Sequence, residues 1–490
     1  MNVPRPQAST CRIGVLGGAV AAILAGCVVE KPDVSIQEKP NISPSVRTPS
    51  PAGDGPPRVE IAPILRDTLA IDLPTVVRTA LAEDVDILQS RLEVEAAQGR
   101  AESAQAQWVP VLSPIPVLFE VVNGGVRATP GNLIDVSFNT LRTFVGAELV
   151  INPGRVYYES VAARKRLLQA AHQEQAVVLS TLHDGAVQYY SLELAQSRVG
   201  VARQSLLEAN ELVRMTRVRL DQGMGVAADK LRAEARLAER MQDLTSALNA
   251  YYRASVQLAT ILRLDPTLTL VPAATDPSLV TLVREDIEIP ELLEMAAKYR
   301  PDLAGVRDRV EVVNAERSAQ AWGGLGPTFA ASYQIGGISG HTDDPDEDFG
   351  TRLEQRFLAA AGWRLRLSTV GDLKAAKAVQ EQARLEADRT LDRVRGQVVL
   401  AAVAAKTNKE LVALSAQQID SAAAALRLVQ SGLQAGTATA LDVLQAQSSL
   451  AQGRLRRARA VVGYNQSQVD LLAAVGLLDE GALIASRRDG

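Results

Sequence analysis

Proline is missing from two long stretches of the chain, and this limits the possible folds more than any other feature. None of the 23 prolines falls between Pro153 and Pro266, and none follows Pro345, so each stretch exceeds 100 residues. Proline breaks helices because it lacks a backbone N–H and clashes with the preceding turn. Both stretches can therefore form continuous helices, which are far longer than a compact globule needs.

The first proline-free stretch carries a seven-residue repeat of apolar or small side chains. The repeat comprises Ala171, Val178, Gly185, Leu192, Val199, Leu206, Val213 and Leu220. A stripe with this period packs helices side by side, as in a coiled coil. The run from Arg155 to Asp221 would be about 100 Å long as a helix. It meets a break at Gly223-Met224-Gly225 and resumes to Leu264. A long helical hairpin is predicted over residues 155–264.

The same sequence pattern occurs twice in the chain. The segment from Leu220 to Glu234 aligns without gaps on the segment from Leu433 to Gln447, at an offset of 213 residues. Upstream, Leu73-Pro74 matches Ile289-Pro290 at an offset of 216, and each pair opens a further amphipathic helix. Internal repetition of this kind indicates a duplicated architecture.

Two tandem halves are therefore predicted. The first covers residues 67–272, and the second covers residues 273–480 with its own hairpin over 372–478. A C-terminal tail at 481–490 completes the chain. Few aromatic residues, 4% of the total, agree with extended helices and not with an aromatic-rich core.

Between the short and the long helices of each half, apolar and polar residues alternate. From Thr328 to Gly337, Phe329, Tyr333 and Ile335 fall on one side, and Ser332 and Gln334 fall on the other. Similar alternation marks Trp363, Leu365 and Leu367, and also Ile134, Val136 and Phe138, with a weaker candidate near 115–122. A period of two is typical of strands, so strand pairs are predicted at about 111–151 and about 327–368.

The polar faces of these strands favour a membrane barrel over a soluble sandwich. Such a barrel has an outer face that meets lipid and a lumen that holds water. Four strands are too few to close it, so several chains must contribute strands. The fold expected is mainly α with a small transmembrane β part.

The N-terminus has the features of a secretory signal. Residues 1–26 contain Arg5 and Arg12, no acidic residue, and an apolar run that is too short to span a bilayer. The run ends in Leu24-Ala25-Gly26-Cys27, which resembles the lipobox of bacterial lipoproteins. This resemblance implies a signal peptide over 1–26 and lipid attached to Cys27. Residues 27–66 are rich in proline and are interpreted as a lipidated tether.

Composition argues against several classes of protein. The net charge is −4 and no basic block is present, so nucleic acid is a poor candidate partner. Three histidines and two cysteines are too few for a Cys/His metal cluster. His172 and His183 are interpreted as solvated or packed side chains, and the acidic run 343–348 is interpreted as a loop between strands. No catalytic motif is present, so no enzymatic activity, no metal and no cofactor are expected.

Tandem halves that each read helix, strand pair, very long helix, glycine-containing turn and helix resemble the TolC-like outer-membrane efflux proteins. The segment from Gly436 to Leu450 looks like the family's second hairpin tip. The resemblance implies a homotrimer that forms a 12-stranded outer-membrane barrel continued by an α-helical barrel in the periplasm. It also implies a periplasmic adaptor, an inner-membrane pump and passive exit of small molecules such as drugs or metals.

The same resemblance assigns roles to residues of the tips. Asp442 falls where the family places a carboxylate ring at the periplasmic aperture, and Gln445 stands where a second carboxylate is common. Asp229 is the repeat equivalent of Asp442, but Ala438 replaces the basic residue expected for a latch. Both aspartates could instead cap the helices that restart after each turn. Adaptor docking is implied for Gly223, Gly225, Gly436 and Thr437.

Two alternative functions remain open at this stage. A protein secretion duct of the type I kind would use the same channel architecture. A lipid-anchored periplasmic coiled-coil scaffold or adaptor would have no pore, but it would not need the alternation around Tyr333.

Overall fold

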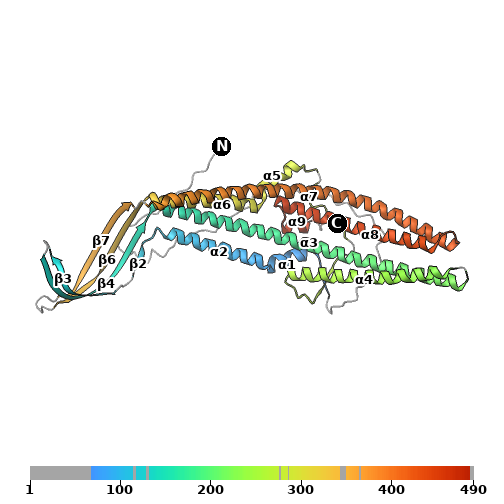
Figure 1. Ribbon diagram of the computed structural model, residues 1–490, viewed down its shortest axis with the longest axis horizontal. Coiled ribbons are helices and arrows are strands. Elements are labelled where there is room, and N and C mark those ends of the chain that lie inside the picture. Colours follow the sequence, from blue (N-terminus) through green and yellow to red (C-terminus); the bar gives the residue numbers. More distant parts are fainter. Residues whose placement is uncertain are drawn as a thin grey trace. The chain divides into compact units, whose positions relative to one another are not determined.

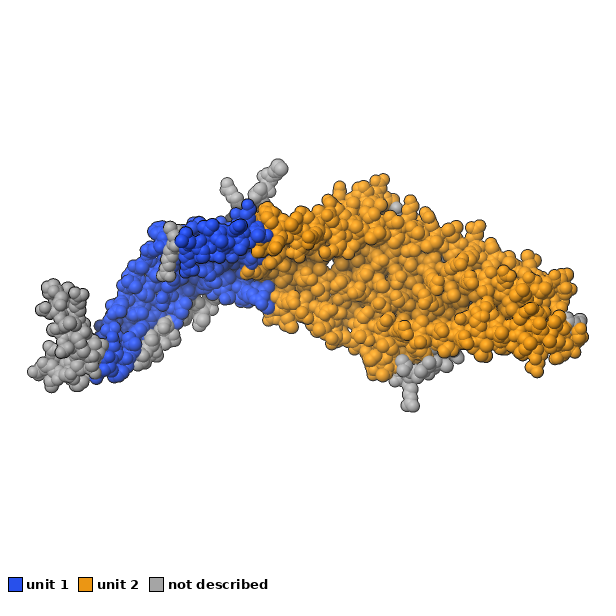
Figure 2. Space-filling view, viewed as in Figure 1, with its two compact units in different colours: residues 1–32, 96–164, 312–378 blue, residues 33–95, 165–311, 379–490 orange. Residues whose placement is uncertain are grey.

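The computed structural model describes residues 68–113, 117–128, 132–223, 225–274, 277–284, 286–342, 349–363 and 366–485. Within these ranges the chain divides into two compact units (Figure 2). The first unit comprises residues 96–164 and 312–378, and the second comprises residues 68–95, 165–311 and 379–485. The predicted signal peptide and tether, Cys27 and the acidic run 343–348 lie outside the described residues.

Both predicted halves consist of shorter helices, then strands, then one very long helix and a further helix (Figure 1). The first half contains β1 (Thr68–Ile71), α1 (Leu73–Glu83), α2 (Val85–Ala106), β2 (Val111–Ser113), β3 (Val117–Ala128), β4 (Asn132–Ile151), α3 (Pro153–Asp221) and α4 (Ala227–Ile261). Strand β5 (Thr269–Pro272) closes the first half; the second contains α5 (Ile289–Tyr299), α6 (Pro301–Leu325), β6 (Pro327–Thr342), β7 (Phe349–Trp363), α7 (Ser368–Ala435) and α8 (Ala440–Val475), and α9 (Glu480–Ala485) falls almost entirely in the predicted tail. The mainly helical fold with a minor β part is confirmed.

The long helices are as long as the proline gaps allow. Helix α3 has 69 residues and α7 has 68, which corresponds to about 100 Å each. Helix α3 begins at Pro153, where a missing N–H is harmless, and the Asn152 side chain accepts a hydrogen bond from the Arg155 N–H. Of the seven-residue stripe, Gly185, Leu192 and Val199 are fully covered by neighbouring helices.

One strand prediction is wrong at its end. Strand β7 ends at Trp363, and Leu367 lies in the turn before α7, while Leu365 lies outside the described residues. The strand instead extends upstream to Phe349. Its alternation is hidden in the sequence by Ala359, Ala360 and Ala361, since alanine marks neither an apolar nor a polar face.

All long strands belong to one antiparallel sheet in the first unit. The order is β2-β4-β6-β7, and β3 also pairs with β4. Strand β4 pairs with β6 from Phe138 opposite Thr342 to Ile151 opposite Phe329. A separate parallel pair, β1 with β5, joins the start and the end of the first predicted half in the second unit.

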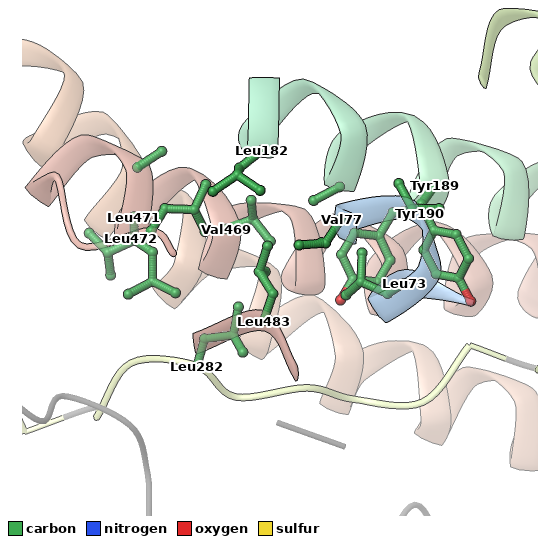
Figure 3. Close-up of a cluster of buried hydrophobic side chains, with 14 of the residues drawn as sticks. Leu73, Val77, Leu182, Tyr189, Tyr190, Leu282, Val469, Leu471, Leu472 and Leu483 are labelled. Carbon is green, nitrogen blue, oxygen red and sulfur yellow. The ribbon is translucent and has the colours of Figure 1, made fainter. Parts of the chain in front are cut away.

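The second unit is built around one large apolar cluster. Helices α1, α3, α5 and α8 contribute side chains such as Val76, Leu192, Leu292 and Leu472, which are at most 2% exposed. Figure 3 shows part of this cluster, in which Leu282 of an extended segment lies near Leu483 of α9 and Val469 of α8. None of the described helices is sufficiently long and apolar to span a membrane.

Candidate functional site

The sheet of the first unit has one apolar face. Residues that lie opposite each other in an antiparallel pair share a face, so the strand register assigns every side chain. Val145, Ile335 and Gln355 form one row, and Ala147, Tyr333 and Phe357 form the next. The apolar face also includes Phe119, Val121, Leu141, Leu149, Phe329, Leu353 and Trp363. Large side chains on this face are exposed, with Phe357 at 71% and Trp363 at 67%.

The other face of the sheet is polar. It carries Glu120, Thr140, Arg142, Glu148, Ser332, Gln334, Arg352, Glu354 and Arg356, interrupted by Leu118, Phe144, Ile338 and Leu358. The predicted separation of Tyr333 and Ile335 from Ser332 and Gln334 is confirmed. Thr140 on the polar face is 5% exposed, whereas its neighbour Leu141 on the apolar face is 42% exposed. The polar face is therefore covered near Thr140, whereas Leu118 and Leu358 on the same face are 48% and 59% exposed.

The sheet ends in two open edges. Strand β7 pairs only with β6, and β3 pairs only with β4, in the part of the chain that the structure describes. Exposed edges carry unpaired backbone N–H and C=O groups, which in lipid cost several kcal/mol each as an order of magnitude. A sheet with an exposed apolar face and two open edges is thus incomplete as a single chain.

The two helical hairpins turn at equivalent glycines. Gly223 has φ of 73° and Gly436 has φ of 79°, a left-handed conformation that favours glycine. At Gly436 the chain is closed by hydrogen bonds from the N–H groups of Thr437 and Ala438 to the Gly432 carbonyl, at 2.8 and 3.1 Å. Gly225 is required for a different reason, because a Cβ there would lie 2.8 Å from the backbone nitrogen of Leu220.

Asp442 caps helix α8 at this turn. Its Oδ2 atom accepts hydrogen bonds from the N–H of Thr439 at 2.9 Å and from the hydroxyl of Thr439 at 2.7 Å. The Asp442 N–H donates to the Thr439 hydroxyl oxygen at 3.2 Å, which completes a capping box. The hydroxyl and backbone hydrogen bonds from Thr439 hold the pKa of Asp442 below its usual range. Asp442 therefore helps to cap helix α8, as one of the two interpretations of the sequence proposed.

Gln445 and Asp229 lie in different surroundings. Gln445 lines an open groove of about 480 Å³ between α4 and α8, together with Arg232 and Arg236. Asp229 lies in the first turn of α4 and accepts a hydrogen bond from Arg232 at 3.2 Å. The N-cap of α4 is Val226, which has no side-chain acceptor, so the repeat-equivalent caps differ.

A contact between the two tips involves a residue that the sequence did not single out. No basic residue stands at Ala438, but the Arg219 guanidinium donates to the Leu433 carbonyl near the end of α7. A cation there also interacts favourably with the helix dipole. The two hairpins also pack through an apolar cluster, which comprises Leu212, Ala233, Leu426, Leu433, Val443 and Leu450.

The two helix histidines each bind an aspartate of another helix. On α3, His172 contacts Asp308 of α6 at 2.7 Å, and His183 contacts Asp470 of α8 at 2.7 Å through Nε2. His183 also contacts Asp184 at 3.0 Å through Nδ1. Among the described residues, no group of three His, Cys, Asp or Glu side chains could hold a metal ion. Each histidine therefore links α3 to a neighbouring helix through a carboxylate.

The His183 contact predicts a pH-dependent stability. The hydrogen bond with Asp470 outweighs burial and raises the pKa of His183 above its ordinary value of 6.5. The stabilisation is then fully present below pH 6.5 and is lost as pH rises through the higher folded-state pKa. We expect His183→Gln to lower the free energy of unfolding by about 1–2 kcal/mol at pH 5.5 and by much less at pH 9. Thermal unfolding at both pH values measures this.

Asp470→Asn serves as the partner control for this experiment. It removes the carboxylate but leaves the imidazole, so it should show the same loss at pH 5.5. A deficit of equal size at both pH values would contradict a protonated His183.

Comparisons with known proteins agree with this geometry. The family model described as outer membrane efflux protein matches residues 146–262 and 292–477. Nodulation protein T of Rhizobium leguminosarum bv. trifolii is 24% identical over 417 residues, which cover 82% of this chain and 85% of that protein.

Solved channel structures share the fold. The outer membrane protein VceC of Vibrio cholerae has a TM-score of 0.71 at 19% identity, covering 82% of this chain and 96% of that one. The open state of the Neisseria gonorrhoeae MtrE outer membrane channel has a TM-score of 0.67 at 19% identity, covering 87% and 98%. The two matched regions contain most of both long hairpins and the strands between them, and the chain belongs to the outer membrane efflux protein family.

Proposed function

We propose that the protein is a passive exit duct in the outer membrane, through which an inner-membrane pump drives small molecules such as drugs or metals. The observation that carries this proposal is the sheet with one apolar face, one polar face and two open edges. A lipid-anchored scaffold without a pore has no use for such a sheet. Efflux channels carry out no chemical conversion, so the protein is not an enzyme and needs no cofactor.

Three copies of the chain would complete the sheet. Strands β3, β4, β6 and β7 from each copy make 12, and the open β7 edge of one copy can pair with the open β3 edge of the next. Pairing in this way would give the backbone N–H and C=O groups of both edges hydrogen-bond partners, which is the condition for a barrel in lipid. The apolar face with Phe357 and Trp363 would then contact lipid, and the polar face with Arg142 and Gln334 would line a water-filled lumen.

The hairpin tips would form the periplasmic end of the duct. The two turns, with Gly223, Gly436 and Thr437 exposed and Gly225 half-buried, are then the surface that a periplasmic adaptor contacts. Asp442 would contribute one carboxylate per copy to a narrow aperture. Three carboxylates around one axis favour cations over anions. The Arg219 contact with Leu433 would hold the tips of one copy together.

Lipid on Cys27 would anchor the mature chain in the outer membrane. The support is the lipobox segment Leu24-Ala25-Gly26-Cys27. We expect Cys27→Ser to leave an unlipidated precursor. Compared with the mature wild type, its mass gains the signal peptide and lacks the acyl chains. Intact-mass spectrometry of membrane-extracted protein measures both. An unmodified mature Cys27 in the wild type would refute the anchor.

The aperture is tested by two substitutions of Asp442. In a planar bilayer, we expect small cation-selective currents from the wild type and a loss of that selectivity in Asp442→Asn, because asparagine keeps a capping oxygen but carries no charge. Asp442→Ala loses the cap as well, which costs about 1 kcal/mol at the tip, and larger currents are expected.

The possible outcomes separate the parts of the proposal. Unchanged currents in both variants would keep the channel but place its constriction elsewhere. An absence of current from well-folded wild-type trimers would favour the anchored scaffold.

A further inference from the structure

The polar face of the sheet contains a guanidinium that no described carboxylate neutralises. Arg142 of β4 has its Nε atom buried and without a hydrogen-bond partner. Two rows further along the polar face, Arg356 binds Glu354 at 3.0 Å, so these two charges cancel. Arg142 has no such partner among the described residues. The Arg142 side chain as a whole is half-buried, but a buried donor left unpaired costs free energy, which makes this position unusual.

The unpaired guanidinium lines a cavity. The cavity has a volume of about 250 Å³ and is lined by Leu118, Arg142, Thr143, Phe144, Gln334, Gly336, Gly337, Glu354 and Arg356. Gly336 stands directly opposite both Phe144 and Glu354 in the strand register, so the middle row of the polar face lacks a side chain on β6. Strands β4 and β6 approach too closely at Gly336 for a Cβ, so the space for a group from solution lies among the polar side chains of the lining, which include Arg142 and Gln334.

A second cation reinforces the site. Arg142 lies opposite Ile338, which in turn lies opposite Arg352, so the two arginines occupy one row of the polar face. Two strand spacings separate them, or about 10 Å. The row has no carboxylate, since its fourth member, opposite Arg142 on β3, is Leu118. Glu120 lies in the next row, opposite Thr140, so with Glu354 and Arg356 cancelling, the two arginines still leave a positive net charge around the cavity.

We propose that Arg142 forms a binding subsite for a single oxyanion group, such as a sulfonate, phosphate or carboxylate, on the polar face of the sheet. The planar guanidinium can present two parallel N–H donors to such a group, and the Gln334 amide in the same cavity can donate a third hydrogen bond. This inference rests on the proposed function, because the polar face lines the lumen only in the closed barrel. An anionic group on an exported molecule would then pause at Arg142 on its way out.

Inorganic sulfate is a suitable probe, since its oxygens match the guanidinium fork. Potassium sulfate is titrated into single-channel recordings of the purified protein in potassium chloride, in the Asp442→Asn background so that the tip carboxylates do not repel the probe. We expect sulfate to interrupt the current, and Arg142→Gln to raise the half-blocking concentration at least tenfold. Arg142→Lys keeps the charge but not the fork, so an intermediate increase is expected.

Matched controls separate this site from general electrostatics. Arg78→Gln removes an exposed guanidinium of α1, which is no part of the sheet, and should leave the block unchanged. An Arg142→Gln channel that sulfate blocks as strongly as its parent would overturn the subsite. A block that changes equally in Arg78→Gln would do the same.

A binding measurement keeps the subsite testable without current. Calorimetric titration of sulfate into the detergent-solubilised protein should show binding that Arg142→Gln weakens tenfold. Binding without current would support the subsite and contradict the duct, whereas current without sulfate binding would support the duct and contradict the subsite. Gel filtration identifies variants that fail to fold, and Arg142→Lys then serves in place of Arg142→Gln.

Discussion

Gly336→Ala is expected to prevent the protein from forming a stable assembly in the outer membrane. A Cβ at Gly336 would lie 2.5 Å from Cα of Phe144 and 2.6 Å from its Cβ, and closer still to the Thr143 carbonyl oxygen. These are mainly backbone atoms of the paired strand β4, so no side chain can rotate away. Separation of the two strands would break ladder hydrogen bonds in the middle of the sheet, at an expected cost above about 3 kcal/mol. The fraction of protein in outer-membrane trimers, resolved by native electrophoresis, measures the effect.

Gly362→Ala is the matched control in the same sheet. A Cβ at Gly362 of β7 has nothing within 4 Å, so this variant should assemble as the wild type does. Gly336→Ala trimers formed at the wild-type level would show that β4 and β6 can separate without loss of the sheet. Since Phe144 and Gly336 also flank the Arg142 cavity, the close approach of these strands shapes that cavity as well.

The helical part of the fold follows from local sequence features. The proline gaps and the glycines at 223 and 436 predicted both long hairpins to within a few residues. Helix continuity and left-handed turns depend on which residues stand at those positions, and not on distant contacts. The strands were harder to predict. Alternation around Tyr333 identified β6, but the alanines of β7 hid its extent and shifted the predicted strand to Leu367.

The candidate site was predictable only where the repeat or the family motif marked it. Asp442 was identified from the motif, but its capping box with Thr439 depends on the exact turn geometry. Arg219 was not identified, because its partner is a backbone carbonyl 214 residues away and backbone groups leave no sequence signal. Arg142 was missed for a similar reason, since an unpaired charge is recognised only once its neighbours are known.

Gln468→Leu is expected to destabilise the second unit strongly. Residues 277–284, just after the boundary between the two predicted halves, form an extended connecting segment without a strand ladder. The Gln468 side chain, 3% exposed on α8, accepts hydrogen bonds from the N–H groups of Leu282 and Val283 at 3.1 and 3.0 Å. Leucine has a similar volume but leaves both buried N–H groups unpaired, which costs about 1–3 kcal/mol each. We expect the thermal midpoint to fall by roughly 5–10 °C.

Hydrogen exchange distinguishes this mechanism from a general loss of stability. The N–H groups of Leu282 and Val283 should exchange faster in Gln468→Leu, while the N–H of Val280 stays protected by Asn465 at 2.9 Å. Gln466→Leu is the matched control on the same helix, because its amide makes only long contacts of 3.3 and 3.4 Å with α3. A larger drop in midpoint for Gln466→Leu than for Gln468→Leu would mean that α8 is held mainly by α3. The reverse order would mean that α8 is also fixed by the connecting segment, which then stabilises the packing of the two halves.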